Sequence, residues 1–348
     1  MTPTDRLLAR IRADGPMTLA DYMAEALGNP AWGYYATRDP LGRDFTTAPE
    51  ISQMFGELVG LALAQAWLDQ GSPAPVTLAE LGPGRGTLMA DALRATRGVP
   101  GFHAALRVHL VETSPVLRAR QAEALEGYDP AFHDRVAGLP EGPLLLVANE
   151  FLDALPIRQW RRAGNGWAET MMVERDGALA FAQASPVAVA ALADRDDVPE
   201  GGVVEICPIL PGVVGAAAAR AAQGGAAVFV DYGHWASRGD TLQAMRDGAA
   251  VDPLGGPGTA DLTAHVDFAA VAEAAAPCAV SPMVPQGVWL ERLGITARAR
   301  ALALRLSGEA LEAHVAAHRR LTHPEAMGDL FKVMALTPKG APGVAGLA

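Results

Sequence analysis

A carboxylate and a series of glycines stand close together in one short stretch that could bind a charged ligand. Glu80 is followed by Gly82, Gly84 and Gly86 in the pattern E-x-G-x-G-x-G. Glycine has no Cβ and accepts positive φ angles, so a ligand can approach such a turn closely. The dinucleotide fingerprint is G-x-G-x-x-G and binds a pyrophosphate, which a carboxylate would repel. A leading carboxylate suits a ligand that carries a cationic amine and no phosphate, and S-adenosylmethionine (SAM) is such a ligand.

The residues around this turn predict the elements that would position it. An apolar run leads into Glu80, and the segment 88–96 favours a helix. The order is therefore strand, tight turn and helix. The first N–H groups of a helix have no partner within it, so they would point toward whatever binds in the turn.

Two further acidic residues follow predicted strands. Glu112 comes directly after an apolar strand at 106–111, and an acidic residue at this place in a parallel nucleotide-binding sheet binds ribose hydroxyls. Asp134 follows a short strand at 131–133, where its carboxylate could accept a hydrogen bond from the exocyclic amine of adenine. The alternative interpretations are a solvated strand end for Glu112 and a turn residue for Asp134.

Polar residues also follow two later apolar strands. The strand at 143–148 leads into Asn149, Glu150 and Asp153, and the strand at 226–230 leads into Asp231 and, three residues on, His234. Open α/β sheets bind ligands at the carboxyl ends of their strands. Helix capping would explain Asn149 or Asp153 but leaves Glu150 unexplained.

A polar loop precedes the glycine turn in the chain. Its polar side chains include Asp44, Thr46 and Glu50, and it leads into a long apolar helix predicted at 51–69. Capping of that helix accounts for one or two polar residues of this loop, not for all of them. The remainder indicate a binding function.

The other segments predict an α/β chain with an insertion. Turn residues separate three β-rich runs at 157–161, 166–173 and 178–181, which read as hairpins that interrupt the α/β alternation. We expect an N-terminal helical cap and loop at 1–70, and a main domain at 71–340 with insertions near 156–205 and 240–330. The tail, 338–348, is expected to be loose.

Bulk composition favours a soluble enzyme. The chain has 348 residues, 50% hydrophobic and 19% charged, with a net charge of −11 and no Lys/Arg block. Nucleic-acid binding needs clustered cations and is disfavoured. An acidic surface fits a cationic substrate better, although it also serves solubility.

The cysteine content and the hydropathy of the chain indicate its cellular compartment. The two cysteines, Cys207 and Cys278, can build neither a disulfide framework nor a four-cysteine zinc site, and no other metal site is expected. A reducing compartment follows, and the Ala/Arg-rich composition suggests a bacterial cytoplasm. No apolar run has the length of a membrane span or of a signal-peptide core, so no membrane insertion is expected. The oligomeric state is left open.

Five strings in a fixed order carry a resemblance to a known family. They are Asp44–Gln53, Glu80–Thr87, Asn149–Pro156, Asp231–His234 and Gly258–Phe268. Together they resemble the MidA-like family, which includes a mitochondrial complex I assembly factor that is a protein-arginine methyltransferase. The resemblance covers roughly residues 16–336. It implies a class I SAM-dependent methyltransferase fold, Rossmann-like, with a seven-stranded, mostly parallel sheet whose last strand is reversed.

The resemblance also implies roles for individual residues. Glu80 and the three glycines would hold the methionine part of SAM, Glu112 would hold the ribose, and the 44–53 loop would cover the cofactor. The activity implied is symmetric dimethylation of an arginine on a complex I subunit, in the mitochondrial matrix for the eukaryotic relatives. We expect Glu150 first, then His234 and Asp153, to act on the guanidinium.

One departure from other arginine methyltransferases affects this catalytic assignment. Those enzymes clamp the guanidinium with two glutamates on one loop, whereas here Glu150 has only Asp153 close behind. A clamp with Asp153, Asp231 or Glu205 is a hypothesis. Two alternatives remain: a methyltransferase of a small molecule, and a SAM-binding complex I assembly factor with little turnover.

Overall fold

The computed structural model describes residues 1–38 and 46–347. The chain forms two compact units, each built from three segments. One, which we call the hairpin unit, comprises Met1–Phe45, Asp153–Leu210 and His234–Asp267; the other, which we call the sheet unit, comprises Thr46–Leu152, Pro211–Gly233 and Phe268–Ala348. Residues 1–70, expected as one segment, contribute to both units. The 156–205 insertion lies within the hairpin unit.

A mixed β-sheet is the centre of the sheet unit. Its strand order is β15-β17-β10-β5-β2-β3-β4, and β16 also pairs with β17. The neighbours from β10 to β4 run parallel, whereas β17 is antiparallel to β10. The expected count of seven strands is not confirmed, because further strands, β16 among them, join the seven strands of this order. The bounds are β2 (Val76–Leu81), β3 (Leu106–Val111), β4 (Ala131–His133), β5 (Leu144–Asn149), β10 (Gly225–His234), β15 (Ala279–Val280), β16 (Val284–Pro285) and β17 (Phe331–Thr337).

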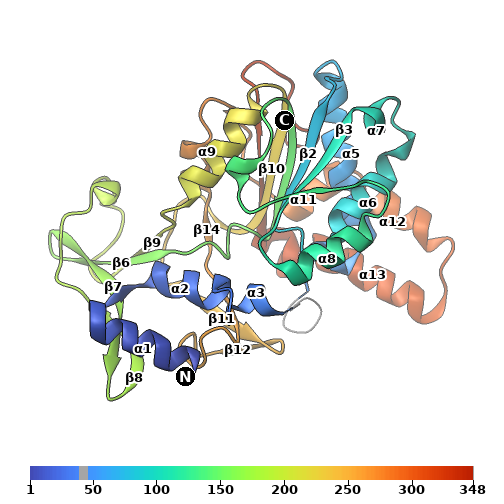
Figure 1. The fold of residues 1–348 in the computed structure, drawn as a ribbon. Coiled ribbons are helices and arrows are strands. Elements are labelled where there is room, and N and C mark those ends of the chain that lie inside the picture. Colours follow the sequence, from blue (N-terminus) through green and yellow to red (C-terminus); the bar gives the residue numbers. More distant parts are fainter. Residues whose placement is uncertain (39–45, 348) are drawn as a thin grey trace. The chain divides into compact units, whose positions relative to one another are not determined.

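Helices cover both faces of this sheet, so its central strands are buried along their whole length. All six residues of β2 and of β5 are buried. Figure 1 shows α9 on one side of β10 and α5 on the other. The helices are α4 (Ala48–Ile51), α5 (Gln53–Asp69), α6 (Thr87–Ala95), α7 (Phe102–Ala105), α8 (Pro115–Ala124), α9 (Leu210–Ala221), α10 (Phe268–Ala274), α11 (Gln286–Arg292), α12 (Ile295–Ala303) and α13 (Gly308–Thr322), with short turns η1 (Thr96–Gly98), η2 (Val136–Gly138) and η4 (Pro324–Gly328).

Capping residues set the helix boundaries that matter for the site. The Ser114 hydroxyl accepts a hydrogen bond from the Leu117 N–H and begins α8, with Pro115 in the first turn as the sequence predicts. The helix predicted at 51–69 is α5, which begins two residues later, and the predicted polar loop before it contains the short helix α4. Ser52 between them is extended (φ −161°), and its hydroxyl caps α5 by accepting from the Met54 N–H.

The hairpin unit contains the predicted hairpins. Its larger sheet has the order β1-β7-β6-β9, with β8 paired to β7, and a small sheet has the order β12-β11-β13. The bounds are β1 (Met17–Thr18), β6 (Arg158–Ala163), β7 (Gly166–Arg175), β8 (Ala178–Gln183), β9 (Val203–Ile206), β11 (Gln243–Arg246), β12 (Ala249–Val251), β13 (Asp261–Thr263) and β14 (Val266–Asp267), with helices α1 (Pro3–Asp14), α2 (Leu19–Gly28), α3 (Tyr34–Thr37) and η3 (Ala190–Leu192).

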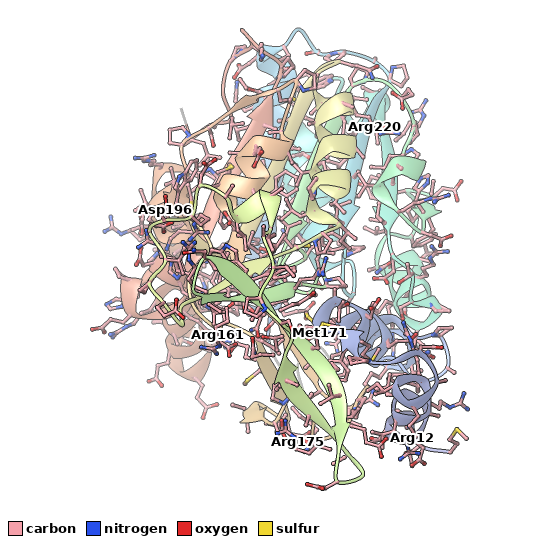
Figure 2. The ribbon with its side chains drawn as sticks, turned by 90° about the vertical axis from the view of Figure 1, so that its left-hand side faces the viewer. Arg12, Arg161, Met171, Arg175, Asp196 and Arg220 are labelled. Atoms are coloured by element: carbon pink, nitrogen blue, oxygen red, sulfur yellow. The ribbon has the colours of Figure 1, made fainter. Side chains whose placement is uncertain are left out.

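Helix α1 packs on the β7–β8 hairpin. Figure 2 shows Arg12 near the end of the hairpin that carries Arg175, and Arg12 pairs with Glu174 through two hydrogen bonds of 2.5 and 2.6 Å. Beneath them, the apolar faces of α1 and α2 join β1 and β7 in one core. The N-terminal helices therefore depend on the hairpins, which lie far away in the sequence.

The expectation of a loose C-terminal tail is wrong for the residues that the structure describes. Val344 and Leu347 are buried in the core of the sheet unit. The indole N–H of Trp289 donates to the Ala345 carbonyl at 3.0 Å, and Arg292 donates to the Gly346 carbonyl at 3.0 Å. Two apolar side chains and two backbone acceptors therefore fix the tail on α11. Across residues 1–38 and 46–347, no helix is both long and apolar enough to span a membrane.

Candidate active site

The glycine turn joins β2 to α6 and has left-handed backbone at each of its three glycines. A Cβ on Gly82 would lie 2.8 Å from Cδ2 of Phe151, so a larger residue would collide with that ring. Gly86 is the N-cap of α6 and offers no side chain to its N–H groups. The turn is therefore shaped as predicted, with glycines required by close packing and by positive φ.

Glu80 is buried one residue before the end of β2. Its side chain is 3% exposed, and Oε2 has no hydrogen-bond partner among the described residues. Burial raises the pKa of Glu80 to about 8, against a smaller opposite effect of a hydrogen bond from the Met89 backbone. A buried carboxylate without a full set of partners costs free energy unless a donor or cation is supplied to it.

Glu112 is held at the end of β3 by three donors. Its Oε1 accepts from the N–H groups of Thr113 and Ser114, both at 2.8 Å, and its Oε2 accepts from Gln121 Nε2 at 3.3 Å. Burial raises the pKa of Glu112, although these hydrogen bonds favour its ionised form. Gln121 also donates to the Gly84 carbonyl at 2.7 Å. The second predicted carboxylate is thus tied to the glycine turn.

Asp134 lies in the sheet unit after β4 and is exposed. Its Oδ1 accepts from Arg118 Nη2 at 2.7 Å, and Arg118 Nε donates to the Glu112 carbonyl at 2.7 Å. The Asp134 side chain is 82% exposed. Through Arg118 the structure links Asp134 to Glu112.

The loop before the glycine turn is described only in part. Asp44 lies outside the described residues. The Thr46 carbonyl accepts from Arg320 at 3.4 Å. Glu50, in α4, accepts from the Thr87 hydroxyl at 2.5 Å and lies 3.8 Å from the Arg85 guanidinium. Glu50 therefore contacts the start of α6, next to the glycine turn.

The end of β5 places polar groups beside α4. Glu150 has φ +51°, an uncommon backbone conformation for a residue other than glycine. Its Oε1 accepts from the Ala48 N–H at 2.8 Å and from Asn149 Nδ2 at 2.9 Å. Asn149 is buried, and its Oδ1 has no partner among the residues that the structure describes. Glu150 thus holds the start of α4.

Asp231 fixes the turn that follows Glu150. Its Oδ2 accepts from the N–H groups of Phe151 and Leu152 at 3.1 and 2.8 Å, and Oδ1 accepts from the Tyr232 N–H at 3.1 Å. Asp231, one of the residues suggested to form a clamp with Glu150, therefore supports this turn. Glu205 lies in the hairpin unit, buried against Gln159 and Thr241.

Asp153 and His234 belong to the hairpin unit, whereas Glu150 belongs to the sheet unit. Asp153 is buried, and its carbonyl accepts from the Ala264 N–H at 3.0 Å. His234 is exposed, with its ring centroid 5.4 Å from that of His265. The predicted catalytic residues are thus divided between the two units.

A half-buried tyrosine lies close to Asp153 in the hairpin unit. The Tyr35 hydroxyl donates to Asp261 Oδ1 at 2.6 Å. Burial, and then the charges of Asp261 and Asp153, raise the pKa of Tyr35 well above its ordinary value. Nothing in the local sequence indicates this contact, because Asp261 lies 226 residues further along the chain.

Comparison with known proteins identifies the family. A family model for S-adenosyl-L-methionine-dependent methyltransferases matches residues 58–285, more than half of the chain. The chain belongs to this family. It is the MidA-like family that the motifs resemble, and SAM is its cofactor. The predictions of an enzyme, of a methyltransferase and of SAM as cofactor are confirmed.

Relatives of known name match nearly the whole chain. The mitochondrial protein arginine methyltransferase NDUFAF7 of zebrafish (Danio rerio) is 36% identical over 94% of this chain and 84% of its own. The human protein of that name is 34% identical over 97% and 84%. A solved structure of a Burkholderia thailandensis protein, described as a methyl transferase and bound to S-adenosyl-homocysteine, has a TM-score of 0.84 at 31% identity and covers 99% of this chain and 93% of its own. The methyltransferase fold is confirmed at this level.

The described residues fit SAM. Glu80 and Asn149 each bury an oxygen that lacks a partner among them, and the turn that follows Glu80 has three glycines with positive φ. An ammonium group would supply the donor that Glu80 needs. Three N–H donors occupy only some of the lone pairs of the Glu112 carboxylate. The remaining lone pairs would accept hydrogen bonds from the ribose hydroxyls.

Proposed function

We propose that this methyltransferase transfers methyl groups to arginine side chains of a protein and forms symmetric dimethylarginine. The observation that carries the proposal is the match to relatives named protein arginine methyltransferases, at 34–37% identity over 94–97% of the chain. The acidic balance of the chain, with a net charge of −11, also favours a cationic substrate.

The cofactor residues orient the donor. When bound, SAM supplies an electrophilic methyl group on its sulfonium. Glu80 would accept from its ammonium group, with the backbone of the glycine turn close to the methionine part, and Glu112 would bind the ribose. Asp44, Thr46 and Glu50 would cover the cofactor, while Asn149 and Asp134 would contact it from the ends of β5 and β4. Holding donor and acceptor in line supplies much of the rate acceleration in such a displacement.

The catalytic residues act on the guanidinium. A guanidinium is cationic and a poor nucleophile, and carboxylates that bind it draw its charge away from the attacking nitrogen. Glu150 is our first candidate for this role, with Asp153 as the second. The proton leaves during or after transfer, and His234 or one of the carboxylates would accept it.

We infer further that the protein substrate is a subunit of respiratory complex I, as the family resemblance implies, and that the enzyme acts in the bacterial cytoplasm. Cationic arginine on a protein surface is open to such an enzyme before the subunit is assembled. The related arginine methyltransferases of zebrafish and human are named as mitochondrial proteins.

The substrate can be identified directly. Lysate from the native host lacking this protein is incubated with the purified enzyme and SAM carrying a labelled methyl group, and labelled species are identified by mass spectrometry. We expect one labelled arginine on a complex I subunit. A labelled metabolite would replace the proposal with a small-molecule methyltransferase. Tight SAM binding with no labelled product would favour an assembly factor that does not need turnover.

A further inference from the structure

Gln121 joins two parts of the SAM site that are separate in the sequence. It lies in α8 with no exposed surface. Its Nε2 donates to the Gly84 carbonyl at 2.7 Å and to Glu112 Oε2 at 3.3 Å. One amide nitrogen therefore contacts both the glycine turn and the carboxylate at the end of β3. Gln121 also packs on the turn: a Cβ on Gly86 would lie 3.4 Å from the Gln121 Cα.

The orientation of the Gln121 amide is dictated by these two acceptors. Its Oε1 is buried with no hydrogen-bond partner in the described part of the chain, which costs free energy. Turning the amide over would place Oε1 against the Gly84 carbonyl and the Glu112 carboxylate, which are both acceptors. Oε1 therefore remains without a partner because Nε2 must face the Gly84 carbonyl and the Glu112 carboxylate.

We propose that Gln121 is a positioning residue that sets Glu112 for recognition of the SAM ribose. The two backbone N–H groups from Thr113 and Ser114 hold Oε1 of Glu112, and Gln121 is the side chain that holds Oε2. With both oxygens fixed, the carboxylate presents its remaining lone pairs in one direction. This inference rests on the proposed role of Glu112 as the ribose ligand.

Loss of the amide would release one end of Glu112. Without the Nε2–H donor, Oε2 can rotate away, and the buried carboxylate also loses a hydrogen bond that favours its ionised form. A ribose hydroxyl then meets a weaker and less ordered acceptor. The ratio of affinities for ligands with and without the hydroxyl isolates this effect, because a change at the Gly84 carbonyl would weaken both ligands alike.

Gln121→Met tests this with a matched control elsewhere in the chain. Methionine keeps the length of the side chain and removes both hydrogen bonds. Gln286 in α11 is also fully buried, donates from Nε2 to a backbone carbonyl (Leu321, 3.0 Å), and leaves Oε1 unpaired among the described residues. Gln286→Met therefore reproduces the general damage of the substitution without touching Glu112.

The readout is the ratio of affinities for S-adenosylhomocysteine and its 2′-deoxy analogue, measured by calorimetry. A hydrogen bond to a carboxylate gives the wild type a preference of about 10- to 100-fold for the ribose form. We expect this preference to fall below about threefold in Gln121→Met and to stay unchanged in Gln286→Met. A merely structural role for Gln121 would weaken both ligands equally.

Failure of the proposed role of Glu112 and failure of the role of Gln121 give different results. A wild type with no preference for the ribose form would remove the role of Glu112 itself. A wild type with that preference, retained in full by Gln121→Met, would overturn the role of Gln121 alone. If Gln121→Met does not fold, Gln121→Asn keeps an amide but is one methylene shorter, which withdraws the donor from Glu112 Oε2. The same loss of preference is expected, and full retention would overturn the inference.

Discussion

At the scale of single residues, we propose that Glu80 selects the ligand that binds at the glycine turn. In the free protein its burial disfavours a charge, so its carboxyl group remains largely protonated up to a pH of about 8. A cationic amine reverses this balance, because the ionised carboxylate gains an ion pair in a poorly solvated place. A pyrophosphate would gain nothing. The residue that favoured SAM in the sequence is thus also the one whose protonation should be coupled to binding.

This coupling predicts a pH dependence of cofactor affinity. Ligand binding requires the ionised form, so each binding event releases a proton when the pH is below the raised pKa. Affinity for S-adenosylhomocysteine should therefore rise with pH by up to about tenfold per unit between pH 6 and 7.5 and level off above pH 8. Calorimetry at several pH values measures this affinity. Glu80→Gln should bind more weakly with a flat pH profile; a flat profile in the wild type would contradict the assignment.

The same pKa has a consequence for the unliganded protein. Because the pKa of Glu80 is raised in the folded state, its contribution to stability is fully present below the ordinary value of 4.5 and is lost as the pH rises through about 8. Bound ligand should offset that loss. The increase in melting temperature on adding S-adenosylhomocysteine should accordingly be larger at pH 8 than at pH 6.

Glu150 has a structural contact as well as a proposed catalytic role, and two substitutions separate them. Glu150→Gln keeps an oxygen that can accept from the Ala48 N–H, but it removes the charge. We expect kcat for arginine methylation to fall at least about 100-fold in Glu150→Gln, as for other groups that stabilise a transition state electrostatically. Affinity for S-adenosylhomocysteine should change little.

Glu150→Ala supplies the comparison. It removes both the charge and the acceptor, so the start of α4 loses its partner and cofactor affinity should fall in addition to kcat. Steady-state kinetics measure kcat for the two variants, and calorimetry measures their affinity for S-adenosylhomocysteine. Unchanged turnover in Glu150→Gln would remove Glu150 from the mechanism and leave it as a residue that holds α4.

At the scale of elements, one buried carboxylate joins three helices of the sheet unit, among them α6, which follows the glycine turn. Glu57 of α5 is 3% exposed. It accepts from Arg94 of α6 at 2.7 Å and from Arg298 of α12 at 2.7 and 3.0 Å. Burial opposes ionisation, but the hydrogen bonds from Arg298 and Arg94 outweigh it and hold the pKa of Glu57 below its ordinary value. The position of α6 therefore depends on this group.

Substitution of Glu57 tests that dependence. Glu57→Gln should lower the free energy of unfolding by about 2 kcal/mol at pH 7, because hydrogen bonds to a charged group are worth roughly 1.5–3 kcal/mol. Since the pKa is lowered in the folded state, this stabilisation is present above 4.5, the ordinary pKa, and is lost as the pH falls through the folded pKa. The difference between variant and wild type in urea denaturation should therefore shrink toward acid pH.

An exposed ion pair serves as the control. Glu123 in α8 lies 3.6 Å from Arg120, and its side chain is 78% exposed. Glu123→Gln should leave the unfolding midpoint unchanged, because exposed pairs contribute little. A Glu57→Gln variant as stable as the wild type at pH 7 would show that α5, α6 and α12 do not need their shared carboxylate.

At the scale of the whole molecule, the parts of the site that could be predicted are those whose determinants are adjacent in the sequence. Glu80 and the glycine turn follow one another, and Glu112 directly follows its strand. Gln121 could not be found in this way, because a glutamine in a polar helix looks solvent-exposed until the fold places it against Gly84 and Glu112. Glu57, an acid in a mostly apolar helix, could not be found for the same reason.

The division of the chain into units was also beyond a reading of the sequence. The N-terminal helices pack with hairpins that come much later, through the pairing of Met17 with Met172, for example. Local patterns predict the hairpins and the helices but not which of them share a core. Composition likewise predicts a loose tail, whereas the Trp289 contact with Ala345 orders it.

The central claim is that this chain methylates arginine on a complex I subunit, and the native host offers the most direct test. Complex I, or its subassemblies, is purified from the wild-type host, from a host lacking this protein, and from that host complemented with wild-type or Glu150→Gln enzyme. Mass spectrometry then follows arginine methylation on every subunit. The account predicts one symmetrically dimethylated arginine that disappears without the enzyme and returns only with the wild-type chain. Identical arginine methylation in all four samples would contradict it.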